Sequence, residues 1–205
     1  LNAVTSKTAE VSDASAATAM YRAEQVLAFA ETVFGHVTDT ELSLVFEDKF
    51  DSIYGNNAYA YRAGTQAVIG LGTDGILTQT SKNVMTWDVL GHEYAHILLS
   101  EICDFKPVSD AGTIAEAYAD LFGEFFEDWA ADGVLDNTCD WVHGAAGKYN
   151  KYEVSRSIFN PEATDNPVFI GQNIISEEQE AALGFSENEI HHRSTVICHA
   201  VWALL

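Results

Sequence analysis

Apolar residues recur every three to four positions in several long stretches of the chain, and this period predicts amphipathic helices. In the first stretch Met20, Leu27 and Phe34 fall on one face, and Gly35 follows at the point where a helix would end. The pattern predicts helices over residues 15–34, 86–101, 112–130, 175–183 and 191–205.

Between the first two predicted helices the period changes to short runs rich in aromatic and β-branched residues. Turns of the types Gly-Asn-Asn, Ala-Gly and Thr-Asp-Gly bound these runs, which predict strands over residues 42–46, 58–62 and 66–71. Residues 1–12 are polar and predict an extended lead-in, and 132–173 predict a loop-rich stretch. A small β region followed by helices indicates the α+β class.

Charge narrows the possible partners. The 205 residues include 31 acidic and 10 basic side chains, for a net charge of −21. A nucleic acid or an anionic membrane would be repelled, and no run approaches the roughly 20 apolar residues that cross a bilayer. So many carboxylates fit a soluble secreted protein or a calcium-binding one, and charge alone does not separate these.

The three cysteines, Cys103, Cys139 and Cys198, allow at most one bridge within the chain. Cys103 and Cys139 each follow one of two predicted helices, so a bridge between them is plausible, and so are two free thiols. Cys198 falls on an apolar helical face and is expected in the core.

The segment Gly91-His92-Glu93-Tyr94-Ala95-His96 places two histidines four residues apart within a predicted helix. Both imidazoles then share one face and reach one metal ion, with Glu93 beside them. Neutral imidazole is a good zinc ligand, and the intervening carboxylate can take a proton from water. The alternative is a pair of ordinary helix histidines.

A catalytic zinc site needs a third protein ligand, and a following antiparallel helix can supply it. Glu116 lies 20 positions after His96, and Asp120, one turn further on, could accept a hydrogen bond from a zinc-bound histidine. Glu124 and Glu127 continue this acidic stripe. We expect a solvated face at Glu124, and cation binding at Glu116 and Glu127.

These motifs resemble the thermolysin-like zinc metalloproteases over about residues 16–205. His92, Glu93 and His96 resemble the family's first ligand, general base and second ligand. The run Glu116-Ala117-x-x-Asp120, followed by Phe122-Gly123, is similar to its third-ligand helix. The resemblance implies a bilobal fold, with the active-site helix at the floor of a cleft.

Further matches concern the substrate. The run Asn56-Asn57-Ala58-Tyr59 resembles the family's edge strand, whose backbone pairs with an extended peptide. Arg156 matches the arginine that binds the substrate carbonyl, and His191 resembles the histidine that stabilises the tetrahedral intermediate. Without the resemblance, Arg156 would be interpreted as a surface or salt-bridge residue and His191 as a capping residue.

The chain departs from the family in several places. A family tyrosine that donates to the oxyanion is replaced near Pro107, which predicts slower turnover. The matching pocket positions are Val89, His143 and Ser155, of which only Val89 is apolar. The family's calcium ligands are matched by Asp88, Glu127 and Asp140, whereas Val142 and Ala145 replace two others, so we expect one calcium ion.

We therefore expect a zinc endopeptidase that cleaves extended peptide or protein substrates, secreted and monomeric. Its lobes are predicted as 1–103, ending in the zinc helix, and 104–205, a helical lobe shorter than the family's. An exopeptidase is disfavoured because no Gly-x-Met-Glu-Asn segment is present. The remaining alternative is a zinc-bound, weakly active or inactive binding module.

Overall fold

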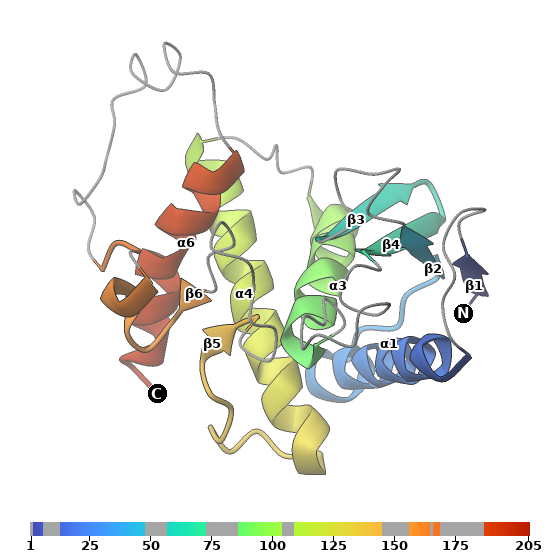
Figure 1. The fold of residues 1–205 in the computed structure, drawn as a ribbon, viewed down its shortest axis with the longest axis horizontal. Helices are drawn as coiled ribbons and strands as arrows, with labels where there is room; N and C mark the ends of the chain where they lie inside the picture. Colours follow the sequence, from blue (N-terminus) through green and yellow to red (C-terminus); the bar gives the residue numbers. More distant parts are fainter. Residues whose placement is uncertain are drawn as a thin grey trace.

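The structure is a computed structural model of the chain, and it describes residues 2–5, 13–47, 57–72, 86–103, 109–144, 156–164, 166–168 and 187–205. Its elements are, in chain order, β1 (Asn2–Thr5), α1 (Asp13–Phe34), β2 (Glu41–Glu47), β3 (Ala58–Ala63), β4 (Gln66–Gly72), α3 (Trp87–Ile102), α4 (Ser109–Asp132), β5 (Val142–His143), β6 (Arg156–Ser157), the 3-10 helix η1 (Pro161–Thr164) and α6 (Glu187–Trp202) (Figure 1).

The larger sheet has the strand order β1-β2-β4-β3. Strand β2 pairs in parallel with β1 and β4, and β3 pairs antiparallel to β4. A tight turn joins β3 to β4, where Gly64 has a φ of +61° that side chains disfavour. Strand β3 therefore forms one edge of the sheet, and its outer side has no partner among the described strands.

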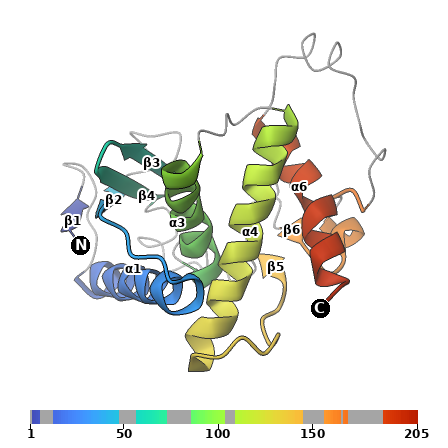
Figure 2. The ribbon, with the colours of Figure 1, turned by 180° about the vertical axis from the view of Figure 1, so that it is seen from behind.

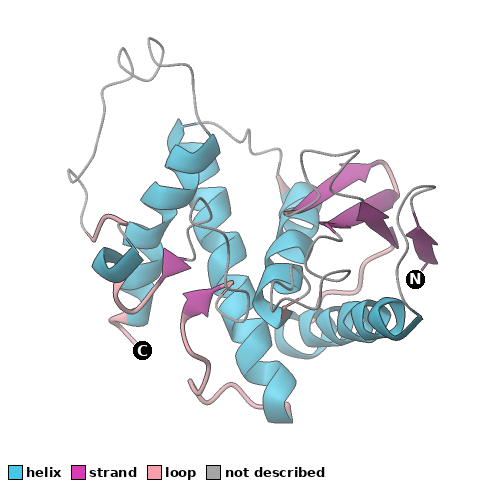
Figure 3. Cartoon of the chain, in the orientation of Figure 1, coloured by secondary structure: helices cyan, strands magenta, loops and turns pink. Residues whose placement is uncertain are grey.

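Three helices follow one another away from the sheet. Helix α3 contacts β3, α4 packs beside α3, and α6 packs on the far side of α4 (Figures 1 and 2). Strands β5 and β6 form a small antiparallel pair near α4 and α6. Figure 3 shows the larger sheet at one end of the molecule and mostly helix in the C-terminal half.

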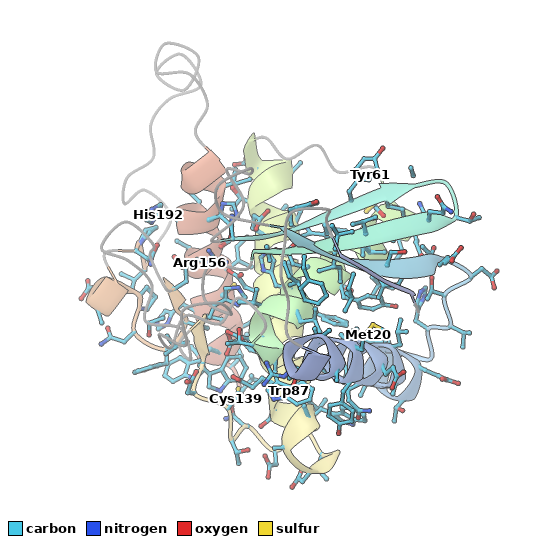
Figure 4. All side chains as sticks on the ribbon, turned by 45° about the vertical axis from the view of Figure 1, so that its right-hand side comes forward. Met20, Tyr61, Trp87, Cys139, Arg156 and His192 are labelled. Atoms are coloured by element: carbon cyan, nitrogen blue, oxygen red, sulfur yellow. The ribbon has the colours of Figure 1, made fainter. Side chains whose placement is uncertain are left out.

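The main core lies where α1, the sheet, α3 and α4 meet. Phe29 of α1 is fully buried, with its ring centroid 5.1 Å from that of Phe122 and 5.5 Å from that of Phe126. Burying one such side chain contributes about 1.5–3 kcal/mol. Met20 and Trp87 pack against this core beside α1 (Figure 4). A second cluster joins α4 to α6 through Ala117, Trp141, Ile158 and Cys198.

Two glycines let α3 and α4 approach closely. A Cβ atom on Gly91 would lie 2.9 Å from the Cα of Gly123, and one on Gly123 would lie 2.4 Å from the backbone oxygen of Asp88. Neither distance leaves room for a side chain, because the neighbouring atoms belong to the backbone. The glycines thus bring the helix of His92 next to the helix of Glu116.

The class and most elements agree with the sequence-based expectation, with two differences. The lead-in is extended over Asn2–Thr5 as predicted, but this segment also pairs with β2 and joins the sheet as β1. The expected loop over 132–173 contains β5, β6 and η1. The predicted helix 175–183 lies outside the described residues. The division into lobes stays a prediction.

Two smaller expectations have outcomes as well. Cys103, Cys139 and Cys198 are all free thiols, and Cys198 is buried as expected. Among the described helices, none is long and apolar enough to span a bilayer.

Candidate metal centre

Helix α3 carries the two histidines and the glutamate of the motif. Its buried positions include His92 and Glu93, and His96 is partly exposed one turn later. Asp88 lies in the first turn, where a negative charge is favourable at the positive end of the helix dipole. The helix continues to Ile102, so the motif lies in a regular helix with its histidines on one face.

Three side chains converge from α3 and α4. The Nε2 atoms of His92 and His96 are 3.1 Å apart. Glu116 Oε2 lies 3.3 Å from His92 Nε2, and Glu116 Oε1 lies 3.5 Å from His96 Nε2. Ligand atoms bound to a tetrahedral zinc ion are roughly 3.3–3.6 Å apart. We name these three residues the metal centre, and their spacing fits such an ion.

A buried orphan atom supports the same conclusion. Glu116 Oε2 has no aligned hydrogen-bond partner among the described residues, although imidazole nitrogens lie close to it. A buried carboxylate oxygen without a hydrogen bond is costly unless another group satisfies it. A cation among the three side chains would satisfy it.

Asp120 holds His92 from behind. His92 Nδ1 donates to Asp120 Oδ1 over 2.9 Å. Arg156 donates to both oxygens of Asp120, from Nη2 at 2.6 Å and from Nε at 2.9 Å, and Ser194 Oγ donates at 3.2 Å. Such a support fixes the tautomer of the histidine and turns its Nε2 toward the metal centre.

The electrostatics of the metal centre follow from burial and close charges. Burial alone would lower the pKa of His92, but the contacts with Asp120 and Glu116 outweigh it and raise the pKa to about 10. Burial would raise the pKa of Glu116, yet contacts with three histidines hold it far below its usual range. The carboxylates thus stay ionised and favour positive charge between them.

Glu93 is buried beside the metal centre. Burial raises the pKa of its carboxyl, against the lowering effect of His92 and His96. A carboxylate with a raised pKa binds a proton more readily, which is what a general base requires. Its place next to His92 in the helix keeps it near any water bound there.

Two further predicted residues lie nearby and contact acidic side chains of α4. His191 Nε2 lies 3.0 Å from Glu116 Oε2. Arg156, on β6, donates both of its hydrogen bonds described above to Asp120, where β6, α4 and α6 meet (Figure 4). A contact of either residue with a substrate stays a prediction.

The predicted substrate strand is described in part. Asn56 lies outside the described residues, Asn57 is exposed immediately before β3, and Ala58 is buried as the first residue of β3. The Asn57 oxygen accepts a hydrogen bond from the backbone of Gly72 over 2.9 Å. The two residues therefore lie at the start of the edge strand.

A second group of acidic residues corrects the sequence-based interpretation. Glu124 is fully buried, so the expectation of a solvated face is wrong there. It groups with Asp88 and His143 on one side, and with Glu127 and Asp140 on the other. The three predicted calcium ligands are thus divided between two groups that share Glu124. In the sequence, only the four-residue spacing of Glu124 from Asp120 indicated that Glu124 faces the same side of α4 as Asp120.

Comparisons with known proteins give a likeness in fold. The sequence matches no protein-family model and no curated protein. The fold is similar to a solved structure described as the precursor of protealysin, a metalloproteinase from Serratia proteamaculans, with a TM-score of 0.61 and 17% identity. The match covers 95% of this chain and 62% of that chain. The chain therefore has a metalloproteinase-like fold of mixed helix and sheet.

Proposed function

We propose that this chain is a zinc-dependent endopeptidase that hydrolyses peptide bonds in extended polypeptides. One observation carries the proposal: two imidazole nitrogens and a carboxylate meet within 3.1–3.5 Å, next to a buried glutamate. His92, His96 and Glu116 would hold the zinc ion, as three protein ligands do in catalytic zinc sites. The fold shared with a metalloproteinase precursor supports the same reaction class.

The chain's own residues divide the chemistry between them. When bound, zinc would supply a Lewis acid that polarises the scissile carbonyl and acidifies water. Glu93 takes a proton from the attacking water and later gives it to the leaving amine. His191, at the mouth of the metal centre beside Glu116, donates a hydrogen bond to the oxyanion. Arg156 acts through Asp120, by fixing the carboxylate that orients His92.

The edge strand β3 would bind the substrate. Its outer side has no partner among the described strands, and β3 contacts helix α3, which carries the metal centre. An extended peptide can add to such an edge through backbone hydrogen bonds. Asn57 and Ala58, at the start of β3, would hold the peptide near the metal centre.

Calcium is proposed at the group that offers oxygen alone. Glu124, Glu127 and Asp140 present carboxylate oxygens that lie within 4.8 Å of one another. Burial and the neighbouring carboxylates raise the pKa of Glu127 to about 7, which a divalent cation would reverse. An unchanged melting temperature after selective calcium chelation would contradict this site.

The experiment is a cleavage assay on a library of internally quenched peptides. The purified chain should cleave, lose activity with a zinc chelator and regain it with added zinc. Glu93→Gln should keep the metal and lose about 10²–10⁴-fold in rate, because the general base is gone. Glu101→Gln, the same change near the end of the same helix, is the matched control and should cleave normally.

Two results would contradict the proposal. Cleavage by Glu93→Gln at the parental rate would show that Glu93 is not the base. Zinc binding to the three ligands without any cleavage of the library would favour a binding module that has lost proteolysis.

A further inference from the structure

A second cluster of possible ligands lies beside the metal centre. It shares no ligand with the metal centre, and it shares Glu124 with the proposed calcium site. Asp88 from α3, Glu124 from α4 and His143 from β5 each offer one atom, and these atoms lie within 4.8 Å of one another. All three residues are buried, with exposed fractions of 2%, 0% and 7%. We call them the buried cluster.

Most polar atoms of the buried cluster lack a hydrogen bond among the described residues. Neither oxygen of Glu124 has a hydrogen bond among the described residues, and the same holds for Asp88 Oδ1 and His143 Nδ1. Gly144 N donates to the other oxygen of Asp88. Four orphan atoms in one buried place would each cost about 1–3 kcal/mol if nothing satisfied them. Their convergence indicates a ligand that supplies several contacts at once.

Among the described residues, the neighbouring basic groups donate no hydrogen bond to Glu124. Arg156 donates two hydrogen bonds to Asp120. The Arg22 guanidinium lies over the Trp87 ring, 4.9 Å from its centroid, and interacts electrostatically with Asp88 and Glu127. His143 faces Asp120 as well as the buried cluster, with its Nε2 atom 3.8 Å from Asp120 Oδ1. Negative charge therefore dominates around Glu124.

We propose that Asp88, Glu124 and His143 form a second metal site, which takes a divalent transition-metal ion such as zinc. Imidazole suits zinc and its neighbours in the first transition row, whereas calcium takes six to eight oxygen ligands. His143 Nδ1 lies 3.6 Å from Glu124 Oε1 and 3.8 Å from Asp88 Oδ2. These distances are those expected for ligand atoms about 2.1 Å from one ion, with ligand–metal–ligand angles near 120°.

A metal ion at the second site would also link three elements of the fold. Its three ligands come from α3, α4 and β5, so one ion would join the two long helices to the small β pair that carries Arg156. It would also place positive charge next to the His143 ring, whose centroid is 4.9 Å from that of His92. The inference does not rest on the proposed function, because it uses none of the catalytic ligands.

Metal counting tests the proposal. The stripped protein is loaded with excess zinc, freed of unbound metal and analysed by mass spectrometry for zinc per chain. We expect two zinc ions in the parent, one in Glu124→Gln, one in His96→Ala and none in the double variant. Millimolar calcium during loading should leave the parental count at two. Glu101→Gln, the same kind of change near the far end of α3 and outside every proposed site, is the matched control and should keep two.

A variant could lose zinc because it folds poorly, and melting temperatures distinguish this from the loss of a ligand. Without metal, Glu124→Gln should melt at or above the parent, because an amide replaces an unpartnered buried acid. Added zinc should then raise the melting temperature of His96→Ala and leave that of His96→Ala with Glu124→Gln unchanged.

The outcomes separate the two proposals. One zinc ion in the parent that His96→Ala removes and Glu124→Gln keeps would overturn the second site and leave the catalytic one intact. Displacement of the second zinc ion by calcium would also overturn the inference. Loss of one ion in Glu124→Gln with full retention of peptide cleavage would support it and show that the second site is separate.

Discussion

The metal centre and the buried cluster lie on the same two helices, yet they are built differently. In the metal centre, His92 is held by Asp120, and Asp120 is in turn bound by Arg156 and Ser194. In the buried cluster, Glu124 has no hydrogen-bond partner among the described residues, and His143 Nδ1 has none either. The protein therefore supports His92 through hydrogen bonds, whereas it offers none to Glu124 within the described residues.

The difference illustrates two ways in which a protein can stabilise a buried carboxylate in its ionised form. A supported carboxylate is ionised by its protein partners, as Asp120 is by Arg156 and by the hydrogen bond from His92, which hold its pKa well below the usual range despite burial. An unsupported carboxylate is forced toward the neutral form, and burial and nearby carboxylates raise the pKa of Glu124 well above its usual range. Such a group depends on an external cation to be ionised.

The largest expected effect comes from removing the support. Asp120→Asn leaves Arg156 buried without its counter-charge, which costs about 3–5 kcal/mol of folding free energy. It also loosens His92, so zinc affinity should fall about 10–100-fold. Urea unfolding and zinc competition with a fluorescent chelator measure the two effects.

The control for Asp120→Asn is Ser194→Ala, which removes one hydrogen bond to the same carboxylate and should cost about 1 kcal/mol. A variant that combines Asp120→Asn with Arg156→Met should regain stability and still bind zinc weakly. Parental zinc affinity in that double variant would show that the Asp120 carboxylate does not contribute to zinc binding by His92.

The next effect concerns the helix crossing that both groups share. Gly123→Ala would place a Cβ atom 2.4 Å from the backbone oxygen of Asp88, so α3 and α4 must separate. Overpacking costs about 1–3 kcal/mol, more than the roughly 1 kcal/mol that alanine contributes to a helix over glycine. We expect lower stability and a lower zinc count at both groups.

Gly64→Ala is the control for the crossing, because its strained φ of +61° lies in the turn between β3 and β4. It should cost about 1–2 kcal/mol and leave the zinc count unchanged. An unaltered zinc count in Gly123→Ala would show that the close approach of the helices does not set the geometry of either group.

The sequence was informative where chemistry follows from local spacing. The four-residue spacing of His92 and His96 predicts a shared helix face, and the structure places their Nε2 atoms 3.1 Å apart. The positions of Glu116 and Asp120 within one following helix were predicted for the same reason. Helix periodicity also gave α1, α3 and α4 to within a few residues.

The parts that the sequence did not reveal depend on long-range packing. The burial of Glu124 depends on a helix crossing at Gly123, and an acidic residue in an acidic stripe has the pattern of a solvated face. His143 joins Asp88 across 55 positions of sequence, and no local pattern indicates such a meeting. Strand β1 is short and its pairing with β2 is equally non-local.

A smaller effect comes from a carboxylate that the backbone satisfies. Asp128 accepts hydrogen bonds from the backbone nitrogens of residues 136–139, at 2.7–3.2 Å, and is almost fully buried. Asp128→Asn weakens these charge-assisted bonds and should cost about 1.5–3 kcal/mol by urea unfolding. Asp132 accepts a hydrogen bond from Val134 N in the exposed turn that follows, so Asp132→Asn should cost less than Asp128→Asn.

Asp128→Asn and Glu124→Gln should affect the stability of the metal-free protein differently. Asp128→Asn should destabilise the metal-free protein, whereas Glu124→Gln should not, since only Asp128 has protein donors. Equal losses for both substitutions would mean that Glu124 has partners of its own, and the case for an external cation would fail.

The smallest effect is pH-dependent and arises at the far end of α3. Glu101 accepts a hydrogen bond from Thr38 Oγ1 at 2.8 Å and one from Thr40, and His36 Nε2 lies 3.0 Å away. Burial opposes these contacts, yet together they lower the pKa of Glu101. A carboxyl with a lower pKa in the folded state adds stability above its unfolded value of about 4.3, and loses it as the pH falls through the folded value.

Glu101→Gln should therefore cost about 1 kcal/mol near pH 7, and the difference from the parent should shrink below about pH 4. Urea unfolding from pH 7 to pH 3 in a chelator measures it without any metal. Because Glu101 is ionised by protein partners alone, adding zinc should not change its contribution. A zinc-dependent gap would mean that the far end of α3 is coupled to the metal centre, and that support and cation cannot be separated along this helix.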